Sequence, residues 1–330
     1  MPNIKSFLIF ILMGITPAYL TAATQSNNVA EETVKQATSK NQENKEILAF
    51  IKKYSSRQLP ESVIKDMISN ASKQDAIIAA MSHPAEAKPW YEYQKRALTP
   101  QRIKLGKDFY KKHKDIFSTL ASKPHVDTSI ILGILGLETN YGSYTGNFRV
   151  LDALYTLSFY YPTENTKPER VRSRQQFFQS ELACFLQLVH QGSFTIELKG
   201  SYAGAFGYAQ FMPSSYRDYA VSAKGNHAAA DLYNAADAIH SINHYLLKKG
   251  HWNSLFNRTN NVQLTSSDAK WQRNLIKLKD TKTYARFQTT PQNDSEYYEL
   301  SDNFKSILSY NNSVNYARVV IELGHNVLYG

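Results

Sequence analysis

Cysteine is nearly absent from the 330-residue chain, which has only Cys184. A single cysteine excludes an intramolecular disulfide. Cys184 has apolar neighbours such as Leu182 and Phe185 in a predicted helix, which favours a small core residue over a nucleophile. Zinc-protease chemistry is also missing, because His240 and His244 have helical spacing without the Glu between them that such an enzyme needs. We therefore expect no metal at these histidines.

The chain also lacks an uninterrupted apolar run of the roughly 20 residues that cross a bilayer. Its N-terminal apolar segment, residues 7–15, follows Lys5 and breaks at Thr16-Pro17, so it predicts a signal peptide rather than an anchor. Small residues place the cleavage after Ala23, and no cysteine stands nearby to take a lipid. We expect an exported protein with a signal peptide over 1–23 and, because of its polar composition, a disordered lead-in over 24–45.

Acidic residues are fewer than basic ones. The 28 Asp and Glu against 38 Lys and Arg give a net charge of +10, which suits a polyanionic partner. Nucleic acid is not the expected partner, because the basic residues are spread along the chain without a zinc-finger, helix-turn-helix or RNA-binding signature. The 22 Tyr and 16 Phe fit a sugar-binding cleft as well as a plain core, so their number does not decide the function.

One carboxylate stands at the end of the most apolar internal stretch. Residues 130–137 are uncharged and predict a buried helix, which Asp127 and Thr128 begin and Gly142 ends. Glu138 falls on the last turn, where partial burial and the negative end of the helix dipole favour the neutral carboxyl. A neutral carboxyl suits a general acid. The alternative is a Glu that only satisfies buried backbone donors.

A second stretch, residues 198–216, alternates glycines with aromatic residues. It cannot be a regular helix or strand throughout, and its composition is typical of a wall where backbone approaches a ligand and rings stack on it. Pro213 then opens a short helix. The glycines are Gly200, Gly204 and Gly207, and the aromatic residues are Tyr202, Phe206, Tyr208 and Phe211.

Helical periodicity dominates the rest of the chain. Residues 88–93 predict an aromatic loop, either a substrate platform or a packed corner. Residues 163–174 predict an exposed excursion before a helix over 175–190. We predict a helical N-terminal subdomain over 46–123, a core over 124–250, a small strand-containing lobe over 251–305, and a closing segment over 306–330 that packs on the core.

Glu181 is the nearest candidate for a second catalytic carboxylate. It lies in the predicted helix over 175–190, close to arginines. A Glu in that setting is more typical of an ion pair than of catalysis.

Four motifs stand in order along the chain: Leu-Gly-Leu-Glu-Thr-Asn-Tyr-Gly at 135–142, Leu-Asp-Ala-Leu-Tyr-Thr-Leu-Ser at 151–158, the glycine-rich stretch at 200–215, and Asp-Ala-Ile at 237–239. Together they make the chain resemble the B-type lytic murein transglycosylases. The resemblance is dense from about Pro124 to Lys249, weaker over the N-terminal helices and sparse in the C-terminal lobe until Tyr310-Asn311. It implies a mainly α fold, with a lysozyme-like helical core, an N-terminal helical subdomain and a small β-containing C-terminal lobe. It also implies a periplasmic enzyme acting on peptidoglycan glycan strands.

The reaction implied by the resemblance cleaves the MurNAc-GlcNAc β-1,4 bond without water and leaves a 1,6-anhydromuramoyl end. Glu138 would act as the acid and then as the base, with the substrate's N-acetyl group standing in for a nucleophile. A hydrolytic muramidase that pairs Glu138 with Glu181, and a non-catalytic glycan-binding protein, are the alternatives. Gln210 has two interpretations: direct contact with the sugar, or a buried amide that ties loops together. Positions matching glycan-site residues of the family are Ser201, Tyr208, Gln210, Tyr245, Tyr310, Asn311 and Tyr93.

The chain departs from the family at its calcium loop, here residues 222–233. Residues 222–230 contain no Asp or Glu, and Lys224 adds a positive charge where a ligand oxygen should be. A divalent cation such as calcium wants six or more oxygens with carboxylates among them, so we expect no metal and no cofactor. The excursion at 163–174 also displaces a basic pair that relatives are thought to place near the wall peptide.

Overall fold

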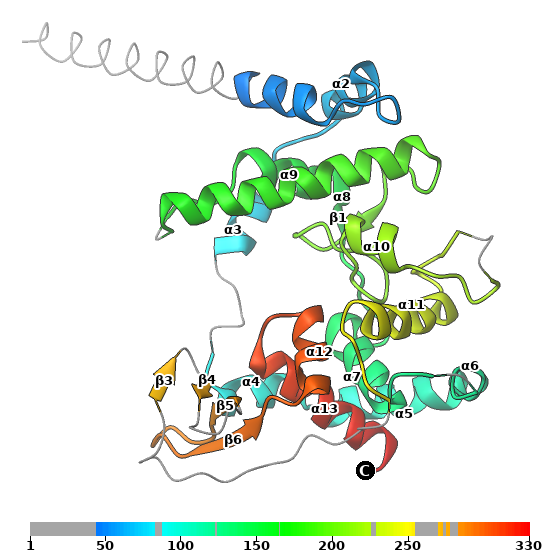
Figure 1. Ribbon diagram of the computed structural model, residues 1–330, viewed down its shortest axis with the longest axis vertical. Helices are drawn as coiled ribbons and strands as arrows, with labels where there is room; N and C mark the ends of the chain where they lie inside the picture. The colour runs from blue at the N-terminus through cyan, green and yellow to red at the C-terminus, as the bar shows by residue number, and fades with distance from the viewer. Residues whose placement is uncertain are drawn as a thin grey trace, which may run out of the picture. The chain divides into compact units, whose positions relative to one another are not determined.

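The computed structural model describes residues 44–82, 88–122, 124–164, 166–225, 229–254, 270–272, 275–277 and 283–330. The chain forms two compact units, residues 1–53 and 54–330. In the first unit, residues 44–53 are helical, while the predicted signal peptide and the lead-in before residue 44 lie outside the described residues. The second unit holds all the elements labelled in Figure 1.

Short helices begin the second unit, and prolines mark where several of them start. Pro60 and Pro89 directly precede α2 and α4, and Pro100 is the first residue of α5, where its missing N–H costs no hydrogen bond. The hydroxyl of Thr99 caps α5 by accepting a bond from the backbone N–H of Arg102. The helices are α2 (Glu61–Ser69), α3 (Asp75–Ser82), α4 (Trp90–Ala97), α5 (Pro100–Lys112) and α6 (Lys114–Leu120).

From Trp90 onward, the aromatic segment at 88–93 is helical and not a loop, because Trp90 is the first residue of α4. Trp90, its first residue, is buried, and its ring meets the edge of the Phe287 ring at a centroid distance of 5.6 Å. Burial of so large a ring anchors the helix through tertiary contacts that local propensity does not reveal. Trp90 therefore belongs to a packed corner, one of its two expected roles.

Helix α7 (Thr128–Thr139) is the buried helix that the apolar run predicted. Asp127 caps its start with a side-chain hydrogen bond to the backbone. Its end differs from the prediction, because Asn140 already adopts the left-handed conformation at φ 53° and stops the helix there. Gly142 is needed for a different reason: a Cβ at this position would lie 2.1 Å from the ring of Tyr208.

The last helix, α13 (Val314–Leu328), packs against α7 with the two backbones in contact. A Cβ on Gly133 of α7 would lie 2.0 Å from the carbonyl oxygen of Val320. A Cβ on Gly324 of α13 would lie 1.8 Å from the carbonyl oxygen of Ser129. Only glycine permits so close an approach at both places. The end of the chain is thus fixed directly on the helix that carries Glu138.

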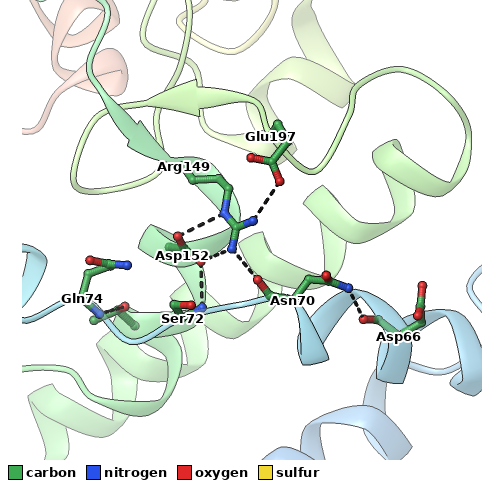
Figure 2. A network of polar contacts seen from close by, with 8 residues as sticks. Asp66, Asn70, Ser72, Gln74, Arg149, Asp152 and Glu197 are labelled. Atoms are coloured by element: carbon green, nitrogen blue, oxygen red, sulfur yellow. Dashed lines mark hydrogen bonds and ion pairs between the residues drawn. The ribbon is translucent and has the colours of Figure 1, made fainter.

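A polar network joins the segment after α2 to the core. Figure 2 shows the Arg149 guanidinium bonded to Asp152, to Glu197 and to the carbonyl oxygen of Asn70. The Asp152 carboxylate, itself buried, also accepts the backbone N–H of Ser72 at 2.8 Å. Arg149 ends β1 (Phe148–Arg149), which pairs with β2 (Lys199–Gly200), and Asp152 lies in α8 (Val150–Phe159).

The excursion predicted at 163–174 is only partly a loop. Helix α9 (Pro168–His190) begins at Pro168 rather than at Gln175. A proline costs no hydrogen bond at the first position of a helix, and Glu169 in the first turn complements the helix dipole. Residues 163, 164 and 167–170 are exposed, as expected for that part of the segment, and Thr166 is half-buried. Two further helices follow, α10 (Pro213–Tyr219), which begins at Pro213 as predicted, and α11 (Ala235–Lys248).

Within the described residues, the β-containing lobe has four strands, arranged antiparallel in the order β3-β4-β5-β6. In β5 the side chains of Tyr284, Ala285 and Phe287 are buried. Helix α12 (Asp302–Tyr310) follows and leads into α13. The strands are β3 (Lys270–Gln272), β4 (Leu275–Lys277), β5 (Thr283–Gln288) and β6 (Ser295–Glu299).

The observed architecture confirms the predicted mainly α fold with a helical core and a small β-containing lobe. Within the described residues, none of the helices combines the length and the apolar character needed to span a bilayer. The predicted subdomain limits inside residues 54–330 remain predictions.

Candidate active site

Glu138, half-buried on the last turn of α7, receives a hydrogen bond from Tyr316 on the first turn of α13. The Tyr316 hydroxyl lies 2.6 Å from Oε1 of Glu138. Burial of the phenol and the nearby Glu138 carboxylate raise the pKa of Tyr316 well above its usual range. The phenol therefore keeps its proton and remains a donor to this carboxylate.

The backbone that follows Glu138 is fixed by side chains of neighbouring elements. Arg102 of α5 donates from Nε to Oδ1 of Asn140 at 3.0 Å. The Thr139 hydroxyl accepts the backbone N–H of Gly142 at 2.9 Å and donates to the carbonyl oxygen of Tyr208 at 3.2 Å. The end of the helix is thus joined to the glycine-rich stretch.

The glycine-rich stretch is neither helix nor strand over most of its length, as predicted. Ser201 and Ala205 form a closed turn, in which the Ser201 N–H donates to the Ala205 carbonyl at 2.7 Å and the Ala205 N–H donates to the Ser201 hydroxyl at 3.1 Å. Gly204 and Gly207 have φ values of 82° and 71°, which favour glycine. The Ser201 side chain therefore shapes the wall, whatever else it contacts.

Gln210 ties two loops together, the structural role that the sequence left open for it. Its Nε2 donates to the carbonyl oxygens of Thr145, at 3.1 Å, and Gly207, at 2.9 Å. Its backbone has φ 47°, an uncommon value for a residue other than glycine. The amide thus connects the turn after α7 to the glycine-rich stretch.

An aromatic cluster brings α11, α12 and the glycine-rich stretch together. The rings of Tyr245 and Tyr310 meet edge-to-face at 4.9 Å, and both lie against Phe211, at 5.5 and 6.0 Å. The Tyr245 hydroxyl donates to the Ser309 carbonyl at 2.6 Å, and the Tyr310 hydroxyl donates to the Ala209 carbonyl. Backbone carbonyls thus accept both phenolic protons.

Electrostatics places two of the predicted site tyrosines near Glu138. Burial, and after it the Glu138 charge, raises the pKa of Tyr310 well above its usual range. Tyr93 contributes in the same direction to the raised pKa of Tyr316, so α4 also reaches this region. Burial raises the pKa of Tyr245 to about 12. Tyr310 of α12 and Tyr93 of α4 therefore lie near the Glu138–Tyr316 pair, and Tyr245 of α11 reaches this region through its contact with Tyr310.

Asn311 follows α12 in extended conformation, and its carbonyl oxygen accepts the backbone N–H of Ser313 at 2.8 Å. The Ser313 hydroxyl in turn caps α13 by accepting the backbone N–H of Tyr316. Asn311 therefore stands at the link that sets where α13 begins. Tyr316 was not predicted from the sequence, because its only signal there is its position three residues after the capping Ser313 in the closing helix.

Glu181 caps a helix. Its buried carboxylate accepts the backbone N–H of Ser214 at 2.9 Å and the Ser214 hydroxyl at 2.6 Å. These donors belong to the first turn of α10, where a carboxylate satisfies backbone N–H groups and complements the helix dipole. The arrangement accounts for a buried Glu here without a second catalytic carboxylate.

The loop that follows α10 closes on Asp237, a buried residue in the first turn of α11. Its Oδ1 accepts the backbone N–H of Ala223 and its Oδ2 that of Asp231, both at 2.8 Å. One carboxylate therefore joins both ends of the loop. Among the described residues, no group of three or more His, Cys, Asp and Glu could hold a metal ion. His244 instead has Nδ1 3.0 Å from the carbonyl oxygen of Tyr219.

Comparisons with known proteins agree with this geometry. The model of the transglycosylase SLT domain matches residues 42–325. Membrane-bound lytic murein transglycosylase B of Escherichia coli is 31% identical over 293 residues, which are 80% of this chain and 77% of the relative.

Two solved structures are also similar. The E. coli lytic transglycosylase SLT35 in complex with bulgecin A has a TM-score of 0.72 and 28% identity, over 86% of this chain and 92% of SLT35. SLT35 has also been solved in complex with calcium. The soluble lytic transglycosylase SltB1 of Pseudomonas aeruginosa has a TM-score of 0.71 and 29% identity, over 85% and 97% of the two chains. The lysozyme-like core that the sequence predicted is thereby confirmed.

A family match over most of the chain, a relative above 30% identity and two lytic transglycosylases of the same fold lead to one conclusion. The chain belongs to the transglycosylase SLT domain family and is a lytic murein transglycosylase.

Proposed function

We propose that Glu138 cleaves the MurNAc-β-1,4-GlcNAc bond of peptidoglycan and leaves a 1,6-anhydromuramoyl end. The observation that carries this proposal is the hydrogen bond from Tyr316 to Oε1 of Glu138. A phenol that keeps its proton stabilises the carboxylate that forms once the acid has given its proton away. A Glu that only satisfied backbone donors would not need this partner.

One carboxyl group moves the proton in both steps. Because Oε1 accepts from Tyr316, we assign the mobile proton to Oε2 of Glu138. Oε2 protonates the glycosidic oxygen as the bond to C1 breaks, while the N-acetyl group of the substrate supports C1. The C6 hydroxyl then closes on C1, and its proton returns to Glu138. The proton count balances, and no water is consumed.

The residues around Glu138 give the site its proposed substrate contacts. We assign glycan binding to Ser201, Tyr208, Gln210, Tyr245, Tyr310, Asn311 and Tyr93. Since the hydroxyls of Tyr245 and Tyr310 donate to backbone carbonyls, these residues would present ring surface to the sugar rather than hydroxyl protons. Gln210 would act through the loops that its amide holds.

The cellular setting follows from the same proposal. Peptidoglycan strands are the proposed partner, and the signal peptide predicted at 1–23 would deliver the enzyme to the periplasm. We propose no stable membrane anchor, no nucleic-acid partner and no metal requirement. Calcium, which SLT35 binds in one solved structure, does not fit residues 222–230, because they carry no carboxylate and Asp237 already bonds to the backbone.

Mass spectrometry of the products released from purified sacculi tests the reaction. We expect muropeptides with anhydro ends, one water lighter than the products of hydrolysis. Reducing ends would instead identify a hydrolytic muramidase. The absence of any soluble product from folded protein, across pH and salt, would favour a non-catalytic glycan-binding protein.

A further inference from the structure

Arg318 of α13 is a buried guanidinium enclosed by aromatic rings. Only 6% of the residue is exposed. Its guanidinium carbon lies 4.1 Å from the ring centroid of Trp90, 4.8 Å from that of Phe287 and 4.5 Å from that of Tyr298. These rings come from α4, β5 and β6, so one side chain of α13 contacts three other elements.

Two carboxylates hold the same guanidinium from different elements. Nε of Arg318 donates to Glu322 on the next turn of α13 at 2.7 Å, and Nη2 donates to Glu296 of β6 at 2.5 Å. Nη1 is buried with no hydrogen-bond partner in the described part of the chain. A buried ion pair often adds little net stability compared with apolar packing, and an unpaired donor subtracts from it. Specificity of arrangement is therefore the better explanation for this charged group.

The helix that carries Arg318 also carries the partner of Glu138. Tyr316 lies two positions earlier on α13, and a helix turns by about 200° over two residues, so the two side chains leave on different faces. Tyr316 reaches α7, while Arg318 reaches the small sheet and α4. Nearby, Asn315 donates from Nδ2 to the carbonyl oxygen of Lys88 at 2.9 Å. Side-chain contacts on different faces thus hold the first two turns of α13 in place.

We propose that Arg318 is a positioning residue for the proposed general acid: it fixes the rotation of α13 against the β-containing lobe and so holds the Tyr316 phenol on Glu138. The proposal rests on the function assigned to Glu138 above. The four-stranded sheet β3–β6 would then support catalysis through Arg318 without contacting the substrate. A loosened Arg318 would allow α13 to rotate or shift, and Tyr316 would then lose its short contact.

Arg318→Lys and Arg318→Met test this role. Lys keeps the charge but cannot bridge two carboxylates with a rigid fork, and Met keeps much of the bulk without charge. We expect kcat on sacculi to fall roughly 3- to 30-fold with KM little changed, because the substrate contacts are intact. The alkaline limb of the pH–rate profile should move to higher pH, as it should when Tyr316 itself is removed. If Met prevents folding, Arg318→Lys alone carries the test.

A double-mutant cycle separates positioning from general weakening. If Arg318 acts through Tyr316, the losses from Tyr316→Phe and Arg318→Lys should not multiply in the double variant. Ile64→Ala, in the buried face of α2, is the matched control, since it lowers the melting temperature without touching α13. It should leave kcat and the pH profile unchanged. A folded Arg318→Lys with wild-type kcat and pH profile, or losses that multiply fully, would overturn the proposal.

The proposed function is tested separately by the product. Arg318→Lys should still release anhydro ends, only more slowly. Reducing ends from the wild-type enzyme would refute the reaction assigned to Glu138, whereas the kinetics of the cycle decide the role of Arg318.

Discussion

The Tyr316 hydroxyl donates to Oε1 of Glu138 at 2.6 Å, across 178 residues of sequence. The contact exists because α7 and α13 meet backbone to backbone at Gly133 and Gly324. A phenol held on a half-buried carboxylate stabilises its ionised form, which a general acid must reach in the transition state. The packing of two helices thereby becomes part of the proposed chemistry.

Tyr316→Phe removes the donor and keeps the ring. A hydrogen bond to a charged group contributes about 1.5–3 kcal/mol, so kcat should fall about 10- to 100-fold. The alkaline limb of the pH–rate profile should move to higher pH, because the Glu138 carboxyl releases its proton less readily when no phenol stabilises the resulting carboxylate. Release of muropeptides from sacculi at several pH values measures both effects. Unchanged kcat and pH profile would show that Tyr316 is only a packing residue.

Glu138→Gln should abolish turnover and leave the fold intact. The amide keeps the shape of the side chain, but it cannot exchange the proton. Positioned acid-base catalysis is typically worth about 10²- to 10⁴-fold, so residual activity above about 1% would assign the acid to another group. Glu181→Gln is the contrast variant: it weakens the cap of α10, so it should lower stability far more than activity in the remaining folded enzyme.

Gly133→Ala should damage both stability and activity. Its Cβ would meet the Val320 carbonyl oxygen at 2.0 Å, which forces α13 away from α7. Overpacking of this kind typically costs about 1–3 kcal/mol. Because Tyr316 moves with α13, activity should fall more than the unfolded fraction explains at a temperature below the transition. Gly192→Asn is the control, since nothing lies within 4 Å of its Cβ position and Asn tolerates positive φ.

Alkaline pH should destabilise the fold. Burial raises the pKa of Tyr245 to about 12 and holds those of Tyr310 and Tyr316 well above the usual range. Their protonated forms stabilise the fold fully below the unfolded pKa of about 10. Above it the unfolded chain releases protons that the folded chain retains, so stability falls as pH rises.

Melting scans from pH 8 to 12 measure this loss. Each such tyrosine should contribute a slope of at most about 1.4 kcal/mol per pH unit between its unfolded and folded pKa. Tyr245→Phe should make stability fall less steeply with pH, by the slope that one titrating group contributes, because phenylalanine does not titrate. A melting temperature that stays level through pH 11 would contradict the prediction.

The sequence predicted what local patterns determine. The apolar run around Glu138, the cap at Asp127 and the proline start of α10 are where periodicity and turn chemistry place them. The errors lie where tertiary contacts overrule local signals. Burial of Trp90 turns an expected loop into α4, and Asn140 ends α7 ahead of Gly142.

The site was predicted less completely than the fold. Composition alone drew attention to two features of the sequence. Glu138 is a single carboxylate in an apolar run, and the glycine-rich stretch alternates glycines with aromatic rings, and both patterns are unusual. Tyr316 gives no such signal, since a tyrosine in a closing helix is ordinary until another helix supplies a carboxylate. The capping role of Glu181 was hidden for the same reason, because Ser214 lies far from it in sequence.

Calcium should leave the stability of this enzyme unchanged. Residues 222–230 offer no carboxylate, and both Asp237 oxygens accept backbone N–H groups from the two ends of the loop at 2.8 Å. The carboxylate thus closes the loop by hydrogen bonds. A cation that bound only the folded chain would raise the melting temperature by mass action, so melting scans with calcium and with a chelator should coincide.

Asp237→Ala and Asp237→Asn test whether the Asp237 carboxylate, rather than a bound calcium ion, closes the loop. Two hydrogen bonds to a carboxylate are lost in the Ala variant, which should lower the free energy of unfolding by about 3 kcal/mol. The Asn variant keeps one acceptor oxygen and should lose about half as much. Neither variant should respond to calcium, because the loop lacks the oxygens that a divalent cation requires. A rise of several degrees in wild-type melting temperature on adding calcium, absent from Asp237→Asn and reversed by chelation, would make Asp237 a calcium ligand.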